Sequence, residues 1–500
     1  MPENSRNRIA VNVTSSAVQV IITGLVYFFI YRMLILQLGV EVLGVWSLVV
    51  ATASISNLSN LGFTSAVVKY VAEYNAKEEP GRIDRLLHTS IVSILSLFVL
   101  LAIIVYAAAL LFMDNLIDLQ YIKIALIILP ILLAGLFLNS AVNVITSALE
   151  GFQKNYIRNF ASSVASIGYL ILAIFLIPEI GLIGLAIAQV FQAATIFIIS
   201  YYFLKRTGSG FSILRFHWDR ESFQTLLDYG YKIQAISIFQ LLTDPVTKIL
   251  LGRFHGITTL GFYEMASRLI NQLRQIIAGM NQVSVPIVSH FQQTDKTTIK
   301  YIYERGLSFI IFIAFPLFAG IILFTPYLSK IWIGSIEPVF INCTYILAAG
   351  MLLNILNAQA YYNSLGEGHL NGILFMTLFV LVFNTLLGIV LGRSINIYGV
   401  VIANAVSAAL GSLFLVYYYQ RKNSIKLRDI LKTSDYLTVI SGLLFALSSF
   451  FLLINISEKH NYDLKSMFFF LVLFVIFFIP VAYYNRNFKL LNIFQYFNKD

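Results

Sequence analysis

Charged residues are scarce in this sequence. Only 12% of its 500 residues are Asp, Glu, Lys or Arg, whereas 58% are hydrophobic, and the mean hydropathy is +0.81. Soluble globular proteins carry about 25% charged residues, so this chain has too little polar surface to fold in water. Its 41 Phe and 28 Tyr residues argue against disorder. The composition predicts an all-α polytopic membrane protein.

The sequence has a single cysteine and lacks the common nucleotide-binding motif. Cys343 is the one cysteine, which excludes an intramolecular disulfide bond and a cysteine-based metal site. No GxxxxGK[ST] sequence is present, so the chain does not bind ATP through a P-loop. The longest polar segment between hydrophobic runs, about residues 205–224, is too short for a soluble catalytic domain. We therefore expect a protein that acts within the membrane, is not an enzyme, and uses no metal or cofactor.

Uncharged runs of about 20 residues are long enough to cross the hydrocarbon of a bilayer. The sequence contains twelve such runs, at residues 9–31, 42–68, 89–113, 124–149, 159–178, 180–204, 306–329, 338–366, 370–392, 394–420, 436–457 and 466–485. Two further spans, which contain charges, are expected near residues 226–252 and 258–290, for fourteen predicted helices in all.

The net charge of +10 is concentrated in one set of loops. If the N-terminus is cytoplasmic, 22 Lys and Arg residues fall in cytoplasmic segments and 5 in the opposite loops. Short cytoplasmic loops of membrane proteins carry an excess of Lys and Arg. We therefore predict that both termini are cytoplasmic, and that the basic charge reflects orientation in the bilayer and not binding to nucleic acid.

The chain resembles itself at an offset of about 217 residues. Glycines match at this spacing, as in Gly39 with Gly256, and residues 180–188 parallel residues 395–403. Six helices per copy would give two parallel lobes around a central cavity, as in transporters built of two parallel halves. We predict an N-terminal six-helix lobe at 1–216, a C-terminal six-helix lobe at 217–433, and two further transmembrane helices with a short tail at 434–500.

Two predicted spans carry polar side chains at helical spacing. A polar stripe facing lipid is costly, so each stripe should face a wet cavity or a neighbouring helix, where hydrogen bonding between helices is the alternative explanation. The stripes comprise Asn12, Ser16, Gln19 and Thr23 in one span, and Glu264, Arg268, Asn271, Gln275 and Gln282 in the other.

Charged residues within or beside the spans are mostly basic. They include seven Lys or Arg and three Asp or Glu residues. Arg274 has no acid at helical spacing and is the leading candidate for binding substrate, and Arg32 lies at an offset of 216 from Lys248. A basic cavity would suit a phosphate or pyrophosphate group.

Local ion pairing is the alternative for the other intramembrane charges. Asp228–Lys232, Asp244–Lys248 and Glu264–Arg268 are all acid–base pairs at i, i+4. Pro245 follows Asp244 and should disrupt the helix there. Asp244 and Glu264 are also the candidates for coupling transport to an ion, either H⁺ or Na⁺.

Four short elements of the sequence are residues 38–47, 60–63, 148–151 and 363–368. Together they resemble the polysaccharide or oligosaccharide flippases of the MOP superfamily, which also contains the MATE exporters and the lipid II flippases. The resemblance implies a flippase in a bacterial inner membrane that moves a polyprenyl-pyrophosphate-linked oligosaccharide from the cytoplasmic to the outer leaflet for surface polysaccharide synthesis. Glycan polymerases and glycosyltransferases are the candidate protein partners.

Transport would follow alternating access through a cationic central cavity. The candidate substrate-binding residues are Arg274, Arg32, Lys248, Arg268, Asn12, Gln19, Asn271 and Gln275. The alternatives are a MATE-type ion-coupled exporter of small organic molecules, whose cavity should be acidic, and a lipid II-type peptidoglycan precursor flippase. A membrane enzyme would need a larger external loop, and a scaffold protein would not need polar stripes.

Overall fold

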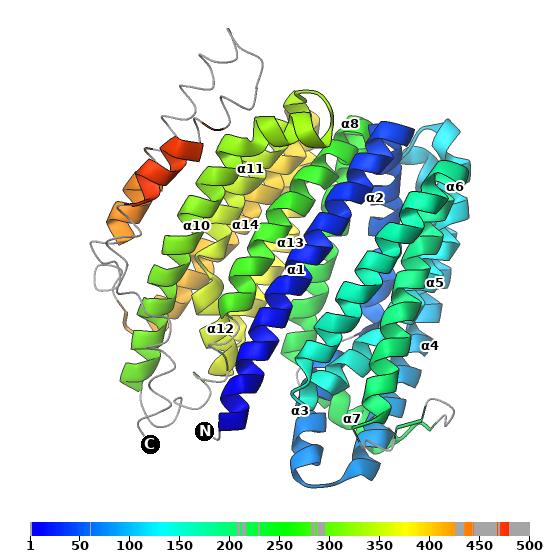
Figure 1. Cartoon of the computed structure of the whole chain (residues 1–500), viewed down its shortest axis with the longest axis vertical. Coiled ribbons are helices and arrows are strands. Elements are labelled where there is room, and N and C mark those ends of the chain that lie inside the picture. The colour runs from blue at the N-terminus through cyan, green and yellow to red at the C-terminus, as the bar shows by residue number, and fades with distance from the viewer. Residues whose placement is uncertain are drawn as a thin grey trace. The chain divides into compact units, whose positions relative to one another are not determined.

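The computed structural model describes residues 3–60, 62–207, 211–212, 217–228, 231–281, 285, 288, 296–425, 435–442, 444, 468 and 471–479. Within these residues the chain is helical (Figure 1). The elements are α1 (Glu3–Leu38), α2 (Val40–Ser54), η1 (Ile55–Asn60), α3 (Phe63–Ala76), α4 (Pro80–Phe112), η2 (Met113–Asn115), α5 (Leu119–Gly151), α6 (Asn155–Lys205), α7 (Arg220–Asp228), α8 (Tyr231–Asn281), α10 (Lys296–Trp332), α11 (Pro338–Ile355), α12 (Ala358–Gly366), α13 (Asn371–Ser394) and α14 (Gly399–Lys422).

Ten helices in the described part of the chain are long and apolar enough to cross a membrane. Two of them, α6 and α8, each run for 51 residues, which is about 76 Å and far more than one crossing needs. Each contains one glycine with non-helical backbone angles, Gly181 in α6 and Gly256 in α8. These helices therefore supply two span-length segments each, and the prediction of an all-α multi-span membrane fold is confirmed.

The chain folds back at these glycines. A Cβ atom placed on Gly184 would lie 2.5 Å from the carbonyl oxygen of Leu176, although eight residues of straight helix cover about 12 Å. The break at Gly181 thus makes a tight helical hairpin, which matches the predicted boundary between the spans 159–178 and 180–204. The predicted spans 436–457 and 466–485 lie largely outside the described residues, and the number of crossings and their orientation stay predictions.

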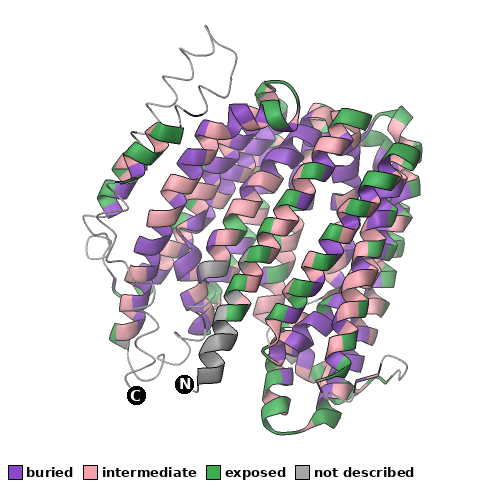
Figure 2. Ribbon diagram, viewed as in Figure 1, coloured by how far each residue is buried: buried purple, intermediate pink, exposed green. Residues whose placement is uncertain are grey.

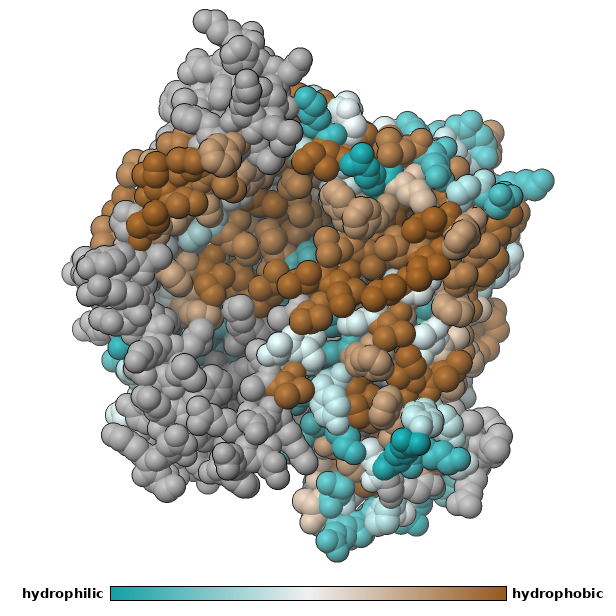
Figure 3. All heavy atoms as spheres, viewed as in Figure 1, coloured by the Kyte–Doolittle hydropathy of each residue, from teal (hydrophilic) through white to brown (hydrophobic). Residues whose placement is uncertain are grey.

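The described helices expose large apolar side chains along their middles. In α4 these include Leu100, Ile103 and Ile104, and in α13 Val382 and Leu386. Figure 3 shows brown, hydrophobic atoms across the middle of the visible face and teal, hydrophilic atoms mainly toward its two ends, and Figure 2 colours the same ribbon by burial. Exposed apolar side chains along a helix are expected where lipid replaces water.

The contacts divide the chain into two compact units, one of Asn4–Glu264 and one of Met265–Asp500 with the first three residues. In the first unit α5 packs along both α6 and α4, and α2 and α3 also contact α5 (Figure 1). In the second unit α14 packs between α13 and α11, and α10 contacts α11 and α12. The predicted lobe boundary at residues 216 and 217 concerns the duplication and stays a prediction.

The same close glycine contacts occur twice along the chain, once in each predicted repeat. A Cβ atom placed on Gly135 would contact Val190, and one placed on Gly350 would contact Ala405. Gly350 lies 215 residues after Gly135, and Ala405 lies 215 residues after Val190. Gly184 against Leu176 recurs in the same way as Gly399 against Leu391. Because the same backbone approaches recur at a nearly constant offset, they support the duplication that the sequence predicts.

The second predicted span, residues 42–68, is not one helix. It consists of α2, then the 3₁₀ helix η1, then α3, which starts after Gly62. Gly62 has a left-handed conformation (φ 73°), and the Thr52 and Ser54 hydroxyls donate to backbone carbonyl oxygens in the last turn of α2. Such hydroxyl groups compete with the helical hydrogen bonds, and a left-handed glycine readily ends a helix. The chain therefore changes helix type within the membrane region.

Candidate functional site

Three charged residues of α8, Asp244, Lys248 and Glu264, form an ion cluster in the first unit. The Lys248 ammonium lies 2.9 Å from Asp244 Oδ2 and 2.8 Å from Glu264 Oε2. Glu264 also accepts a hydrogen bond from the Tyr31 hydroxyl (2.8 Å) and one from the Ser47 hydroxyl (2.8 Å). Lys248 and Glu264 are 7% and 5% exposed. A buried charge is costly unless it is paired and hydrogen-bonded, and this cluster meets both conditions.

The hairpin at Gly256 explains why Lys248 and Glu264 meet. Both residues lie eight positions from Gly256, one on each arm, so folding back brings them opposite each other. Tyr31 and Ser47 are likewise eight positions from Gly39, whose backbone angles (φ 91°, ψ 162°) are close to those of Gly256 (φ 77°, ψ 170°). At the repeat offset of 217, Tyr31 corresponds to Lys248 and Ser47 to Glu264.

This arrangement changes two details of the sequence interpretation. The repeat equivalent of Lys248 is Tyr31, one residue before the predicted Arg32, which is half-buried on α1. The helix also continues through Pro245, and the described non-helical residue of α8 is Gly256. A proline removes a hydrogen bond but its φ angle fits a helix, so neighbouring packing can keep the helix continuous there.

The Lys248 ammonium in the ion cluster faces two carboxylates, those of Asp244 and Glu264. The side chain of Asp244 is 52% exposed, and that of Glu264 is 6% exposed. Lys248 therefore has two carboxylate partners in this arrangement. Whether Asp244 and Glu264 couple transport to an ion, and whether Lys248 binds substrate, stay predictions.

The polar stripe of α1 contacts the start of α6. Asn12 Oδ1 accepts a hydrogen bond from the backbone N–H of Tyr156 (3.0 Å). The Asn159 amide donates to the Ser15 and Ser16 hydroxyls, both at 2.9 Å. Further along α1, the Gln19 amide donates to the Thr23 hydroxyl (3.0 Å). The alternative explanation for this stripe, hydrogen bonding between helices, therefore accounts for Asn12.

The other predicted residues of α8 belong to the second unit. Arg268 and Asn271 are half-buried, Arg274 and Gln275 are exposed, and the Asn271 amide donates to the Ser267 hydroxyl (3.1 Å). In the part of the chain that the structure describes, no carboxylate lies within ion-pair distance of Arg274. A role of these residues in binding substrate stays a prediction.

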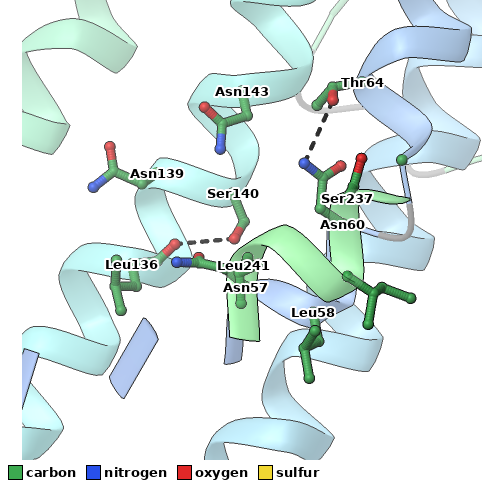
Figure 4. A pocket seen from close by; sticks show the side chains of 12 residues that line it. Asn57, Leu58, Asn60, Thr64, Leu136, Asn139, Ser140, Asn143, Ser237 and Leu241 are labelled. Carbon is green, nitrogen blue, oxygen red and sulfur yellow. Dashed lines mark hydrogen bonds between the residues drawn. The ribbon is translucent and has the colours of Figure 1, made fainter. Parts of the chain in front are cut away.

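A polar cavity of about 380 Å³ lies between η1, α5 and α8 in the first unit (Figure 4). Four asparagines line it, Asn57 and Asn60 from η1 and Asn139 and Asn143 from α5. Sequence reasoning missed them, although each pair stands three or four residues apart in an apolar run. That spacing is the same kind of signal that identified the stripes of α1 and α8.

Comparison with known proteins places the chain among transporters. A family model described as "Polysaccharide biosynthesis protein" matches residues 37–336. A putative O-antigen transporter of Shigella flexneri is 20% identical over 331 residues, which is 66% of this chain and 75% of that protein.

Solved structures share the fold at low identity. The lipid II flippase MurJ in an inward closed conformation gives a TM-score of 0.72 at 15% identity, covering 94% of this chain and 99% of MurJ. An inward-facing MATE family transporter of the MOP superfamily gives 0.68 at 18% identity, covering 82% and 98%. The family and the fold confirm the predictions of a membrane transporter and not an enzyme. The chain belongs to the polysaccharide biosynthesis protein family and has the fold of the MOP superfamily transporters.

Proposed function

We propose that the protein is a flippase that moves a polyprenyl-pyrophosphate-linked oligosaccharide from the cytoplasmic to the outer leaflet. The observation that carries the proposal is membership of the polysaccharide biosynthesis family across residues 37–336. The relative from Shigella flexneri, a putative O-antigen transporter, points to the same class of substrate. Synthesis of a surface polysaccharide from lipid-linked units needs this step, because a sugar–pyrophosphate head cannot cross the hydrocarbon unaided.

The proposed substrate has an apolar part and a polar part, which require different surroundings during the crossing. The polyprenyl tail is apolar and stays in lipid, while the pyrophosphate and the sugars need polar partners throughout the crossing. Guanidinium groups match phosphate oxygens with paired hydrogen bonds, so Arg274, Arg268 and Arg32 are the proposed pyrophosphate contacts. Asn271 and Gln275, on the same segment of α8 as Arg274, would add neutral hydrogen bonds. Alternating access between the two leaflets would carry the head group across.

The ion cluster is the proposed coupling element. Protonation of Glu264, or binding of Na⁺ at Asp244 and Glu264, would change the charge that faces Lys248. A change of charge in a buried cluster shifts the balance between two conformations when they hold the cluster differently. The proposal assigns Lys248 to this element as the counter-ion of the two carboxylates.

A second candidate is a MATE-type exporter of organic cations, which the two carboxylates beside Lys248 favour because carboxylates bind cations. Purified protein in nanodiscs distinguishes the two. Binding of a polyprenyl-pyrophosphate-linked oligosaccharide, with no saturable binding of a cationic dye such as ethidium, supports the flippase. The reverse preference would support the exporter.

The flippase is tested in cells that lack the gene. They should lose surface glycan and accumulate the lipid-linked oligosaccharide on the cytoplasmic side, and the wild-type gene should restore export. Arg274→Ala should lower export at least about 10-fold, the loss expected when a hydrogen-bonded charge is removed. Arg85→Ala is the matched control, because Arg85 is an exposed arginine at the start of α4. Normal export in the deletion strain would contradict the proposal.

A further inference from the structure

The asparagine-lined cavity has no role in the ion cluster or in the predicted arginine contacts. Its shape depends on two local features. Residues three apart in a 3₁₀ helix lie above one another, so Asn57 and Asn60 share a side of η1. Residues four apart on an α-helix are neighbours on one face, so Asn139 and Asn143 share a side of α5. Figure 4 shows these side chains around the cavity.

Gly62 keeps η1 close to α8. A Cβ atom on Gly62 would lie 2.8 Å from Gln234 Cγ, and the left-handed backbone there (φ 73°) also disfavours any other residue. The close approach lets Ser237 of α8 complete the wall of the cavity. The cavity is therefore built by backbone features, and small changes of side chain should not abolish it.

The hydrogen-bonding groups of the cavity are largely unused. In the described residues, the side-chain amides of Asn57, Asn139 and Asn143 have no hydrogen-bond partner. Asn60 Oδ1 is buried without a partner, and the Asn60 amide reaches only the Thr64 hydroxyl, at 3.4 Å. Each amide offers two donors and an acceptor oxygen. Groups of this kind are normally satisfied by water or by a polar ligand.

The lining favours an uncharged ligand that both donates and accepts hydrogen bonds. Among the described residues that line the cavity, none is Asp, Glu, Lys or Arg. A phosphate would call for cations, and an organic cation for carboxylates or aromatic faces. Leu58, Leu136 and Leu241 add apolar surface beside the amides. A sugar ring has the matching chemistry, with hydroxyl groups at its rim and C–H groups on its faces. The volume, about 380 Å³, is in the range of small-molecule sites.

We propose that this cavity is a binding subsite for the uncharged sugar residues of the transported glycolipid. The inference rests on the proposed function and assigns the carbohydrate to the four asparagines and the pyrophosphate to other residues. The asparagines hold sugar hydroxyls by hydrogen bonds, and the leucines contact the ring faces. Because the subsite is neutral, its binding of sugar does not depend on the charge of the ion cluster.

The test measures binding to full-length purified protein in nanodiscs. The probes are the lipid-linked oligosaccharide from the same cells, the free oligosaccharide released from it by mild acid, and polyprenyl pyrophosphate without sugar. The variants are Asn139→Leu, Asn143→Leu and Ser237→Phe, the last of which fills the cavity. Asn115→Leu is the matched control, since Asn115 is exposed in η2. Thermal unfolding of each variant checks folding, and Asn143→Ala replaces any variant that does not fold.

The expected result is a loss of about 2- to 10-fold in affinity for the free oligosaccharide for each asparagine removed. A larger loss is expected for Ser237→Phe, with binding of polyprenyl pyrophosphate unchanged. If the variants bind both glycan probes as the wild type does, the subsite is wrong while the flippase proposal stands. If the wild type binds neither glycan probe, the proposed function fails, and the subsite fails with it.

Discussion

Gly44 and Gly261 face each other where α2 crosses the second arm of α8, and the contact is reciprocal. A Cβ atom on Gly44 would meet the Ile257 carbonyl, and one on Gly261 would meet the Val40 carbonyl. Each would also lie 3.2 Å from the backbone nitrogen of the opposite glycine. The four residues form two pairs separated by 217 positions. Positions 217 residues apart thus contact each other through their backbones, which supports the predicted duplication.

Replacing either glycine by alanine should destabilise the fold. A methyl group has no room against a backbone carbonyl, so Gly44→Ala and Gly261→Ala should each lower the free energy of unfolding by about 1–3 kcal/mol. Gly81→Ala is the control, because a Cβ atom there has no neighbour within 4 Å, and helical alanine should be neutral or stabilising. Denaturant unfolding in detergent measures the change. Equal stability of the wild type and both variants would contradict the close contact.

The Lys248–Glu264 pair should show strong coupling. Lys248→Met removes the ammonium that faces the buried Glu264 carboxylate and should cost about 3–5 kcal/mol, as expected for a broken buried pair. The double variant with Glu264→Gln should lose less than the sum of the two single variants, with a coupling of about 0.5–3 kcal/mol.

The exposed pair Lys77–Glu73 gives the comparison for this cycle. Its atoms are 2.7 Å apart, but the side chains are 53% and 39% exposed, so water screens the two charges and the same cycle there should give a much smaller coupling energy. If the two cycles gave the same coupling energy, burial would not strengthen the Lys248–Glu264 pair.

The two hydroxyl groups that bind Glu264 should each contribute to stability. Tyr31→Phe and Ser47→Ala each remove one donor from a buried carboxylate and should cost about 1.5–3 kcal/mol. Ser407→Ala is the control, because the Ser407 hydroxyl donates only to the Ala403 carbonyl within its own helix. Thermal unfolding of the three variants ranks them. A control as damaging as Tyr31→Phe would argue against a special role for these hydroxyls.

The start of α7 should depend on pH. Asp219 Oδ2 accepts hydrogen bonds from the Ser222 backbone N–H (2.8 Å) and hydroxyl (2.6 Å), which lower the pKa of the Asp219 carboxyl. Because the folded pKa is depressed, the stabilisation is complete above the unfolded value of about 3.9. It is lost as the pH falls through the folded pKa.

Hydrogen exchange at the Ser222 amide measures this effect. Protection should be constant near neutral pH and fall below about pH 4. Asp219→Asn keeps an acceptor and should preserve protection at neutral pH, whereas Asp219→Ala should cost about 1 kcal/mol of local stability. Protection that is insensitive to Asp219→Ala would contradict the cap.

The asparagine cavity should be open to small polar reagents. The one native cysteine, Cys343, is fully buried and gives little background. A cysteine introduced by Asn143→Cys should react with a water-soluble thiol reagent at least about ten times faster than one introduced by Ala148→Cys, which is buried on the same helix. Equal rates, measured by mass spectrometry, would show that the cavity is closed.

The positions of most helices could be predicted because apolar runs of span length leave few alternatives in a bilayer. The run at 124–149 became α5, and the pair 159–178 and 180–204 became the two arms of α6. The break inside residues 42–68 could not be predicted this way, since hydropathy does not distinguish an α-helix from a 3₁₀ helix. There the hydroxyl groups and Gly62 decide the backbone.

The chemistry of the ion cluster was only partly visible in the sequence. The i, i+4 rule correctly paired Asp244 with Lys248. It paired Glu264 with Arg268 on the same grounds, whereas Glu264 also contacts Lys248 across the hairpin. The i, i+4 rule considers neighbours on one continuous helix, so it does not predict contacts between the two arms of a hairpin. With the turn placed at Gly256, positions at equal distance on the two arms become neighbours, and the contact follows.

The 3₁₀ segment η1 also changes the directions in which the side chains before and after it point around the helix axis. A 3₁₀ helix rotates about 120° per residue and an α-helix about 100°, so the six residues of η1 accumulate roughly 120° of extra rotation. Side chains before and after η1 that a single helical wheel would superimpose therefore lie about a third of a turn apart. Any wheel drawn for this part of the chain has to be restarted at Phe63.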